Sequence, residues 1–562
     1  MAFCASRQAL APLEARSTTA VCNSELCRLV SSGKLSDLRW PDFSDYRAHL
    51  QDFYEPASYA FAWTNHGAIT RPAIAMIQVL KRADTKGLAP EDYDSSSWPE
   101  RVAILNQSGK SPSEVDLARF DLALTVSVMR YVSDLHSGRA NPGLFHKGFD
   151  LDDGEHDLAR FVRQQLVAGS DLNRVLESVE PPYAGYRRTL EALRQYVTLA
   201  REDRAARLPV PKKTVDPGTE YSAIAPLTDL LRRLRDLPQS VPIPVNSAMY
   251  GEPLVTAVKH FQARHGLEPD GRLGKATLAQ LNTPLNQRVH QLQLTLERWR
   301  WVPHSFPHPP IVVNIPEFRL RALNGNYASE LDMKVVVGGA YRHQTPIFEA
   351  EMKYLIFRPY WEVPRSILRA ELLPKIEKDT SYFVKHGYEV VNANSTVISK
   401  GALDEEILGA LRAGKLRIRQ VPGPENALGS VKFVFPNPHN VYLHGTPSTE
   451  LFARFRRDFS HGCIRVEKPA ELAAWVLRDK PEWTRKRILD AMNGSQTLQV
   501  TIPKPIPVVI VYATAVAEES GEVDFFEDIY GQDAELERWL AKGYPTSPWQ
   551  PTSGAPGRRP RE

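Results

Sequence analysis

The chain has 562 residues, which suggests about three or four domains at roughly 150 residues each. Its apolar content of 42% and charged content of 24% are typical of a globular protein. The net charge of +4 argues against a nucleic-acid partner, and no run of about 18 apolar residues predicts a membrane-spanning helix.

Residues 1–36 show little periodicity and lack the apolar core of a signal peptide. Taken alone, this start predicts a cytoplasmic protein or a wrongly assigned start. Three of the four cysteines, Cys4, Cys22 and Cys27, lie in this segment, far from Cys463. A disulfide framework is therefore not expected. The isolated Cys463 is either a small buried apolar residue or a nucleophile.

Residues 37–215 are predicted to form a helical scaffold. Pro72 opens one helix, whose apolar face is expected to hold Ile74, Ile77 and Leu80. A longer helix is expected to end before Gly138. The scaffold carries no group of residues that suggests catalysis.

A linker rich in proline and glycine at 209–218 leads into a compact helical unit, predicted over 216–301. Its apolar residues at i, i+3, i+4 and i+7 are Leu254, Ala257, Val258 and Phe261. A second short helix is expected to end near Leu281, and a third leads out to Trp299.

Over 302–515 the apolar residues alternate with a period of two, as in β-strands. These short β-rich runs predict a sandwich-like domain with few helices. Residues 360–425 interrupt these runs as a predicted helical insertion. An insertion this long between strands is typical of a functional lid, so we expect a cap over the active site. Residues 516–562 are a C-terminal segment with a short basic tail at 557–561. The fold class is therefore multidomain α+β.

The segment 441–466 carries the chemistry. It places His444 at the end of a strand and the turn Ser460-His461-Gly462-Cys463 nearby. A free thiol has a pKa near 8.5 and needs a base to become a nucleophile at neutral pH, which an imidazole supplies. Gly462 allows a close approach of the backbone, and the amides of Gly462 and Cys463 could face a developing oxyanion.

Two alternatives compete with a cysteine acyltransferase. One is a buried structural cysteine, although the polar neighbours of Cys463 argue against it. The other is a zinc site, with candidate ligands His439, His444, His461 and Cys463. The paired spacing typical of zinc motifs is absent, so the sequence favours the acyltransferase.

The pattern H-x(14–17)-[S/T]-H-G-C resembles the signature of L,D-transpeptidases, and 15 residues separate His444 from Ser460 here. The segments RPYWEVPRSI (358–367), PGPENALGSVKF (422–433) and FPNPHNVYLHGTP (435–447) resemble the large members of that family. The stretches RWPDFSDY (39–46), GLAPEDY (87–93) and SGRANP (137–142) resemble their scaffold domain. Residues 257–282 resemble a small three-helix peptidoglycan-binding domain.

The resemblance implies roles for individual residues. Cys463 corresponds to the nucleophile, His444 to the base and proton donor, and the backbone carbonyl of Gly445 orients the imidazole. Further candidates for contacts to substrate or oxyanion are Gly462, His461, Ser460, Arg465 and Tyr442. Arg465 either pairs with a substrate carboxylate or braces the loop. The chain departs from the family at Gly445, where many large members have Asp, and at Arg465, where smaller members have Asn.

The function implied is the formation of 3→3 peptidoglycan cross-links through a cysteine thioester, with release of D-alanine and with carbapenems as inhibitors. An L,D-carboxypeptidase and a non-catalytic wall-binding protein are the alternatives. The expected partners are donor and acceptor tetrapeptide stems of peptidoglycan, with cell-wall synthesis proteins as further candidates and no nucleic acid. No cofactor or metal is implied. The substrate places the protein in the periplasm or cell envelope, with a role in cell-wall organisation and cell shape.

Overall fold

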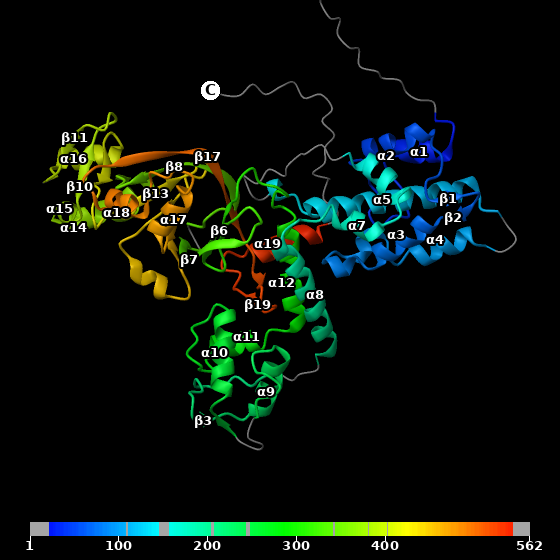
Figure 1. Cartoon of the computed structure of the whole chain (residues 1–562), viewed down its shortest axis with the longest axis horizontal. Helices are drawn as coiled ribbons and strands as arrows, with labels where there is room; N and C mark the ends of the chain where they lie inside the picture. The colour runs from blue at the N-terminus through cyan, green and yellow to red at the C-terminus, as the bar shows by residue number, and fades with distance from the viewer. Residues whose placement is uncertain are drawn as a thin grey trace, which may run out of the picture.

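The computed structural model of the chain describes residues 22–107, 111–144, 157–203, 207–242, 248–340, 343–379, 381–401 and 403–542. Cys4 and the basic tail at 557–561, both considered in the sequence, lie outside these residues. Figure 1 shows a scaffold of helices at one end of an elongated molecule and a β-rich domain with its cap at the other. A small helical unit projects from the middle.

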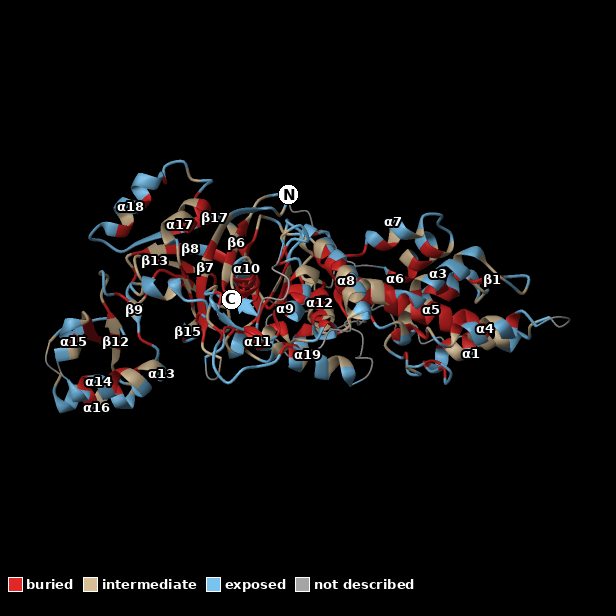
Figure 2. Ribbon diagram, turned by 90° about the horizontal axis from the view of Figure 1, so that it is seen from below, coloured by how far each residue is buried: buried red, intermediate tan, exposed pale blue. Residues whose placement is uncertain are grey.

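The scaffold is built around one long buried helix. Its helices are α1 (Glu25–Ser32), α2 (Arg47–Tyr54), α3 (Arg71–Lys81), α4 (Trp98–Leu105), α5 (Glu114–Ser137), α6 (Leu158–Phe161) and α7 (Leu172–Glu177), with the hairpin β1 (Thr64–Asn65) and β2 (Ala68–Ile69). Helix α5 is buried over most of its length, as Figure 2 shows, because the other helices surround it. As predicted, it ends before Gly138.

Three expectations for this region were wrong or incomplete. Ile74 is 51% exposed, because the buried face of α3 holds Ala73, Met76, Ile77 and Leu80. The segment 1–36 contains α1, which is capped by Ser24 and contributes to the scaffold core. Cys22 and Cys27 form a disulfide. The bridge joins two residues only five positions apart, so it restrains the start of α1 and is not part of a disulfide framework.

The small helical unit contains α9 (Ile224–Arg233), α10 (Leu254–Arg264) and α11 (Lys275–Leu281), with strands β3 (Thr219–Glu220) and β4 (Met249–Tyr250). The predicted apolar face of α10 is buried in its core. Helix α12 (Leu285–Trp299) leaves this core and packs along α8 (Ala184–Glu202). Leu292 and Leu296 of α12 share an apolar cluster with Leu193 of α8. The pair α8–α12 thus links the three parts of the molecule (Figure 1).

The β-rich domain is a single sheet that closes on itself. Its strands are β5 (Ile311–Asn314), β6 (Arg319–Leu323), β7 (Ser329–Gly338), β8 (Phe348–Phe357), β13 (Val431–Val434), β14 (Leu443–His444), β15 (Asp458–Ser460), β16 (Ile464–Val466) and β17 (Leu498–Val511). They lie in the order β15-β7-β16-β14-β13-β8-β17-β5-β6, and β7 also pairs with β6. One apolar core fills the interior, because alternate residues of all these strands except β15 point inward.

Helices and a hairpin complete this domain: α17 (Pro469–Val476), α18 (Arg485–Asn493), β18 (Ala515–Ala517), β19 (Val523–Phe525) and α19 (Gln532–Ala541). The described part of the C-terminal segment is therefore folded. Phe525 of β19 packs in the cluster of α8 and α12, and Leu536 of α19 packs in the core of the sheet.

The cap differs from its prediction as a helical insertion. It contains α13 (Arg365–Ile367), α14 (Leu373–Lys378), α15 (Ser381–Lys385) and α16 (Glu405–Ala413), but also β9 (Trp361–Glu362), β10 (Tyr388–Val391), β11 (Val397–Ser399) and β12 (Arg417–Gln420). These strands form a second sheet, in the order β11-β10-β12-β9, with its own apolar core. Strands of two to four residues are too short to show a period of two in the sequence.

Within the described residues, no helix is both long and apolar enough to span a membrane.

Candidate active site

Three neighbouring strands bring five polar side chains to one face of the sheet. Strands β14 and β16 run parallel, with His444 opposite Arg465, and Lys432 of β13 lies opposite His444 on the other side. Because side chains alternate along extended chain, Tyr442 and Cys463, two positions earlier, face the same side. We call Lys432, Tyr442, His444, Cys463 and Arg465 the thiol face. The intervening residues of these strands are buried in the core.

Cys463 is a free, partly exposed cysteine. Its Sγ lies 3.8 Å from the carbonyl oxygen of Asn440. The hydroxyl and the backbone amide of Tyr442 lie near the sulfur and favour its thiolate form. Burial raises the pKa of the Cys463 thiol, and these two groups of Tyr442 and the charges of Lys432 and Arg465 oppose that rise. The resting sulfur is therefore a thiol with neighbours suited to a thiolate.

His444 is buried and held in one tautomer. Its Nδ1 lies 2.5 Å from the carbonyl oxygen of Gly445. A carbonyl only accepts, so Nδ1 carries the proton and Nε2 carries a lone pair. Burial, together with the charges of Arg465 and Lys432, lowers the pKa of His444 to about 3. The imidazole is thus neutral at physiological pH and can accept a proton at Nε2.

The thiol and the imidazole are neighbours on this face without a direct hydrogen bond. Among the interactions of the described residues, none joins Cys463 Sγ to the His444 ring. Tyr442 lies beside both, since it is opposite Cys463 in the register of β14 and β16 and its ring centroid lies 5.6 Å from that of His444. Catalytic contacts are often long before substrate binds.

Hydrogen bonds fix the turn before Cys463. Ser460 Oγ donates to the carbonyl oxygen of Cys463 at 2.5 Å and accepts from the Gly462 amide at 3.2 Å. Gly462 has φ +108°, in the region that favours glycine. The expectation that both amides face an oxyanion therefore needs correction, because Ser460 occupies the amide of Gly462. Within the described chain the Cys463 amide has no acceptor, so it is the amide of this pair that remains available.

Residues distant in sequence support this turn from behind. Thr345 Oγ1 donates to the carbonyl oxygen of Gly462 at 2.9 Å and accepts from the Gly338 amide. Tyr530 Oη donates to the carbonyl oxygen of Gly338 at 2.5 Å and accepts from the Thr345 amide at 3.3 Å. Neither Thr345 nor Tyr530 belongs to a recognisable motif, so neither could be predicted from the sequence.

The cap touches the site at two points. His461 is exposed, and its Nε2 lies 2.5 Å from Glu371 Oε1 in the cap. The Trp361 side chain of β9 lies near the Tyr442 hydroxyl. Glu371 lies in a π-helical turn (Leu368–Leu372) between α13 and α14, a local irregularity that is frequent at functional sites.

The residues considered for zinc do not form a ligand set. His461 is directed at Glu371, and the ring of His439 packs against Phe348 with centroids 5.0 Å apart. Over the described ranges, no group of three or more His, Cys, Asp or Glu side chains is placed to hold a metal ion.

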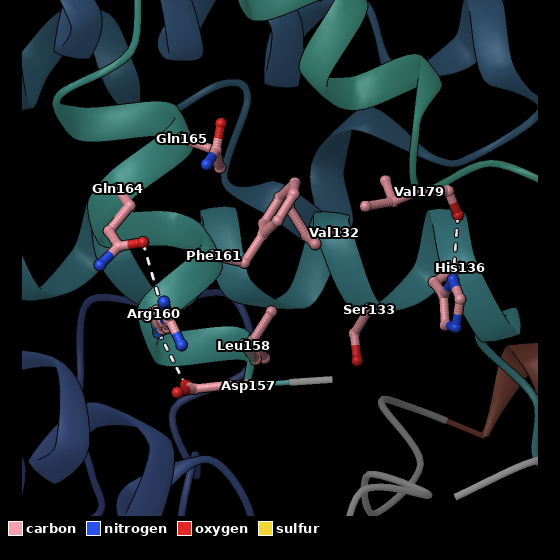
Figure 3. A pocket seen from close by; sticks show the side chains of 10 residues that line it. All are labelled: Val132, Ser133, His136, Asp157, Leu158, Arg160, Phe161, Gln164, Gln165 and Val179. Atoms are coloured by element: carbon pink, nitrogen blue, oxygen red, sulfur yellow. Dashed lines mark hydrogen bonds between the residues drawn. The ribbon is translucent and has the colours of Figure 1, made fainter. Parts of the chain in front are cut away.

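A cavity of about 350 Å³ lies elsewhere, in the scaffold between α5 and α6 (Figure 3). Apolar side chains such as Phe161 and Val132 line much of it. Its one histidine, His136, is hydrogen-bonded through Nδ1 to the carbonyl oxygen of Val179. The cavity shows no pairing of nucleophile and base, so the thiol face remains the candidate active site.

Comparison with known families agrees with this reading. Residues 309–508 match the model of the L,D-transpeptidase catalytic domain. Residues 48–193 match a scaffold domain, and residues 225–281 match a domain described as "Putative peptidoglycan binding domain". The chain therefore contains regions similar to the L,D-transpeptidase catalytic domain, to a scaffold domain and to a peptidoglycan-binding domain. The predicted resemblance and the α+β fold class are confirmed.

A curated relative is similar to part of the chain. It is a protein of Haemophilus influenzae named "Putative L,D-transpeptidase", 32% identical over 248 residues. The match covers 44% of this chain, and the chain spans about half of that relative's length, 49%. A crystal structure of the L,D-transpeptidase of Xylanimonas cellulosilytica is 14% identical, with a TM-score of 0.17, over 54% of this chain and 100% of that one. A TM-score this low supports no conclusion.

Proposed function

We propose that the protein is an L,D-transpeptidase that forms 3→3 cross-links in peptidoglycan, with Cys463 as nucleophile and His444 as base. The observation that carries this proposal is the thiol face. There a free thiol and a neutral imidazole with its lone pair on Nε2 lie on the same face of two neighbouring strands, within a region that matches the L,D-transpeptidase catalytic domain.

The first half-reaction forms a thioester. Cys463 Sγ attacks the carbonyl carbon of the third residue of a tetrapeptide stem while its proton passes to His444 Nε2. The Cys463 amide donates to the oxyanion. The C–N bond then breaks, and the imidazolium returns the proton to the departing D-alanine. Because the thiol and imidazole are not hydrogen-bonded in this state, the two side chains must close on each other when the stem binds.

The second half-reaction transfers the acyl group. The side-chain amine of a diaminopimelate on a neighbouring stem attacks the thioester, gives its proton to His444, and releases the thiol. Water would instead yield a tripeptide, which is the L,D-carboxypeptidase alternative. The cap contacts at Tyr442 and His461 support a role in limiting access of water to the thioester.

Arg465 is suited to bind a substrate carboxylate. Among the described residues it has no ion-pair partner within 4.0 Å, although its guanidinium is mostly buried beside Cys463. A stem peptide presents carboxylates close to the scissile bond. We therefore assign to Arg465 the recognition of a stem carboxylate, rather than only a bracing of the loop.

The remaining domains and the cysteines support an envelope location. A peptidoglycan-binding domain would dock the enzyme on its polymer, and the Cys22–Cys27 disulfide suits an oxidising compartment. We propose the periplasm or cell envelope, with peptidoglycan stems as partners and a role in wall organisation and cell shape.

Product analysis tests the reaction. The full chain is incubated with a disaccharide-tetrapeptide, and the products are identified by mass spectrometry. A cross-linked dimer with release of D-alanine is expected, and Cys463→Ala should form none. Tripeptide as the sole product would replace transfer to an amine by transfer to water.

A carbapenem separates the enzyme from a non-catalytic wall-binding protein. The intact protein should gain the mass of one carbapenem, while Cys463→Ala should gain nothing. An equal adduct on Cys463→Ala, or no adduct on the native chain, would contradict the assignment of Cys463.

A further inference from the structure

Lys432 is a cation on the thiol face that no part of the mechanism above employs. It lies on β13 directly opposite His444 and is only partly exposed. Its Nζ lies 3.9 Å from the centroid of the Tyr442 ring. Within the described chain it has no ion pair with a carboxylate. Partial burial removes some of its hydration and lowers the pKa of Lys432.

Tyr442 connects this charge to the sulfur. One face of its ring receives the Lys432 ammonium, which is an attractive cation–π arrangement. In the register of β14 and β16, Tyr442 lies opposite Cys463, and its hydroxyl and backbone amide favour the thiolate form of the sulfur. The Trp361 side chain of the cap lies near the same hydroxyl. Lys432 thus packs on the residue that lies next to Cys463.

Because His444 is neutral, it supplies no positive charge to a thiolate. In many cysteine enzymes an imidazolium stabilises the thiolate. Here burial and two cations keep the pKa of His444 at about 3, so the imidazolium is not present before the reaction starts. A partly buried thiolate would then have only hydrogen bonds and fixed cations to stabilise it.

We propose that Lys432, packed on Tyr442, is a positioning residue that stabilises the Cys463 thiolate by its fixed positive charge. The proposal rests on the proposed role of Cys463 as nucleophile. In this scheme the thiol proton leaves to His444 Nε2, and the negative charge on sulfur develops next to the Tyr442 hydroxyl and within the field of Lys432. The charge therefore lowers the barrier to attack without taking part in proton transfer.

Other charged groups also face this region. Arg465 of β16 is a second cation, and its charge likewise favours the thiolate. Glu362 of β9 interacts with Lys432, and Glu450 interacts with Arg465, each favouring the charged form of its cation. Burial lowers the pKa of Lys432 and that of Arg465, and these two carboxylates oppose the fall. The charges that act on the sulfur, those of Lys432 and Arg465, are positive.

The pH dependence of thiol alkylation tests the proposal without any turnover. The full chain is prepared with Cys4→Ser, so that Cys463 is the only thiol outside the Cys22–Cys27 disulfide. Its rate of reaction with iodoacetamide is then followed from pH 6 to pH 10. Lys432→Met should raise the midpoint by about one pH unit, which slows alkylation about tenfold below the midpoint.

Three further variants separate the effect of charge from that of packing. Lys432→Arg keeps the charge and should leave the midpoint near that of the native side chain. Lys353→Met removes an exposed lysine from the adjacent strand β8 and should change nothing. Tyr442→Phe keeps the ring under Lys432 but removes the hydroxyl, and should raise the midpoint and slow alkylation severalfold.

The proposal is overturned if Lys432→Met leaves the midpoint unchanged, or if Lys432→Arg shifts it as far as Lys432→Met does. Unfolding by urea confirms that each variant is folded before its midpoint is used. Failure of the proposed function would look different. Cross-linking would then persist in Cys463→Ala, whatever the alkylation of the native thiol shows.

Discussion

His444 shows how surroundings set the state of one side chain. The ring is buried, its Nδ1 is bonded to a carbonyl, and two cations, Lys432 and Arg465, lie nearby. Each of burial and like charge disfavours the imidazolium. The consequence is a histidine that stays neutral over the pH range in which most histidines titrate, and this has a measurable effect on stability.

The pH dependence of folding follows from that state. The pKa of His444 is about 3 in the folded chain and about 6.5 when unfolded, so between these values only the unfolded chain binds the proton. The stability that His444 contributes is complete above pH 6.5 and is lost as the pH falls towards 3. At pH 5 the native chain should lose about 2 kcal/mol relative to pH 7 through this residue.

Urea unfolding of the native chain and of His444→Gln at pH 7 and pH 5 measures this effect. Other groups titrate in both proteins alike, so the comparison isolates His444. The free energy of unfolding lost between pH 7 and pH 5 should be about 2 kcal/mol smaller in His444→Gln than in the native chain. Equal losses in the two proteins would show that His444 titrates normally.

Much of the site at this scale could be predicted from the sequence. The spacing of His444 and Cys463 within one motif predicts both as reacting groups, and both lie on the thiol face. Lys432, Trp361 and Glu371 could not be selected, because their position depends on strand register and on the fold of the cap. The use of the Gly462 amide by Ser460 likewise depends on the exact shape of a turn.

At the scale of elements, strand β7 and the turn before Cys463 depend on one glycine. A Cβ at Gly338 would lie 1.8 Å from the carbonyl oxygen of His343 and 2.8 Å from the Thr345 amide nitrogen. Both contacts are to backbone, so the chain between β7 and β8 would have to move. That chain carries Thr345, which holds the carbonyl of Gly462.

Gly338→Ala should therefore destabilise the domain by about 2–3 kcal/mol and slow alkylation of Cys463. Urea unfolding and the iodoacetamide rate measure the two effects. Gly325→Ala is the matched control, because its Cβ would meet nothing within 4 Å. A Gly338→Ala protein with the stability of the control would contradict the close packing behind the turn.

Helices could be predicted from the sequence where their apolar residues keep a regular spacing over several turns. Helices α5 and α10 carry apolar residues over several turns, and both form as expected. The sheet of the cap was missed because its strands have two to four residues. Ile74 was wrongly predicted to lie on the buried face of α3. Ala73 and Met76 pack on that face instead, and the apolar pattern alone does not distinguish two adjacent faces of a helix.

At the scale of the whole molecule, the small helical unit that contains α9, α10 and α11 is held to the hairpin β18–β19. Arg264 of α10 donates to the carbonyl oxygen of Val523 at 2.8 Å and to Asp236 of its own unit. His260 lies between Asp236 and Glu522, at 2.8 Å and 3.1 Å. One buried arginine therefore joins the inside of the unit to the C-terminal hairpin.

Arg264→Leu should loosen this docking. It removes the hydrogen bond to the Val523 carbonyl oxygen, and the buried carboxylate of Asp236 loses a positively charged partner. Small-angle X-ray scattering should show a larger radius of gyration than in the native chain. Arg272→Leu removes a half-exposed ion pair within the same unit and serves as control. An unchanged radius of gyration in Arg264→Leu would mean that other contacts suffice for docking.

The order of the parts along the chain could be predicted, but not their assembly. The composition and the spacing of apolar residues predicted a helical scaffold, then the small helical unit, then the β-rich domain. The pairing of α8 with α12 joins residues some 100 positions apart, and the hairpin β18–β19 packs on both. Such contacts leave no local pattern, so the segment after 516 showed no sign of being part of the core.

The central claim is that the Cys463 sulfur carries the acyl group, and the acyl-enzyme itself tests it most directly. The full chain is mixed with a tetrapeptide stem, quenched in acid within seconds, digested, and mapped by mass spectrometry. The account predicts a thioester mass of the tripeptide stem on the peptide that contains Cys463, absent in Cys463→Ala. A stem attached to another residue, or cross-linked product formed with an unmodified Cys463 throughout, would contradict it.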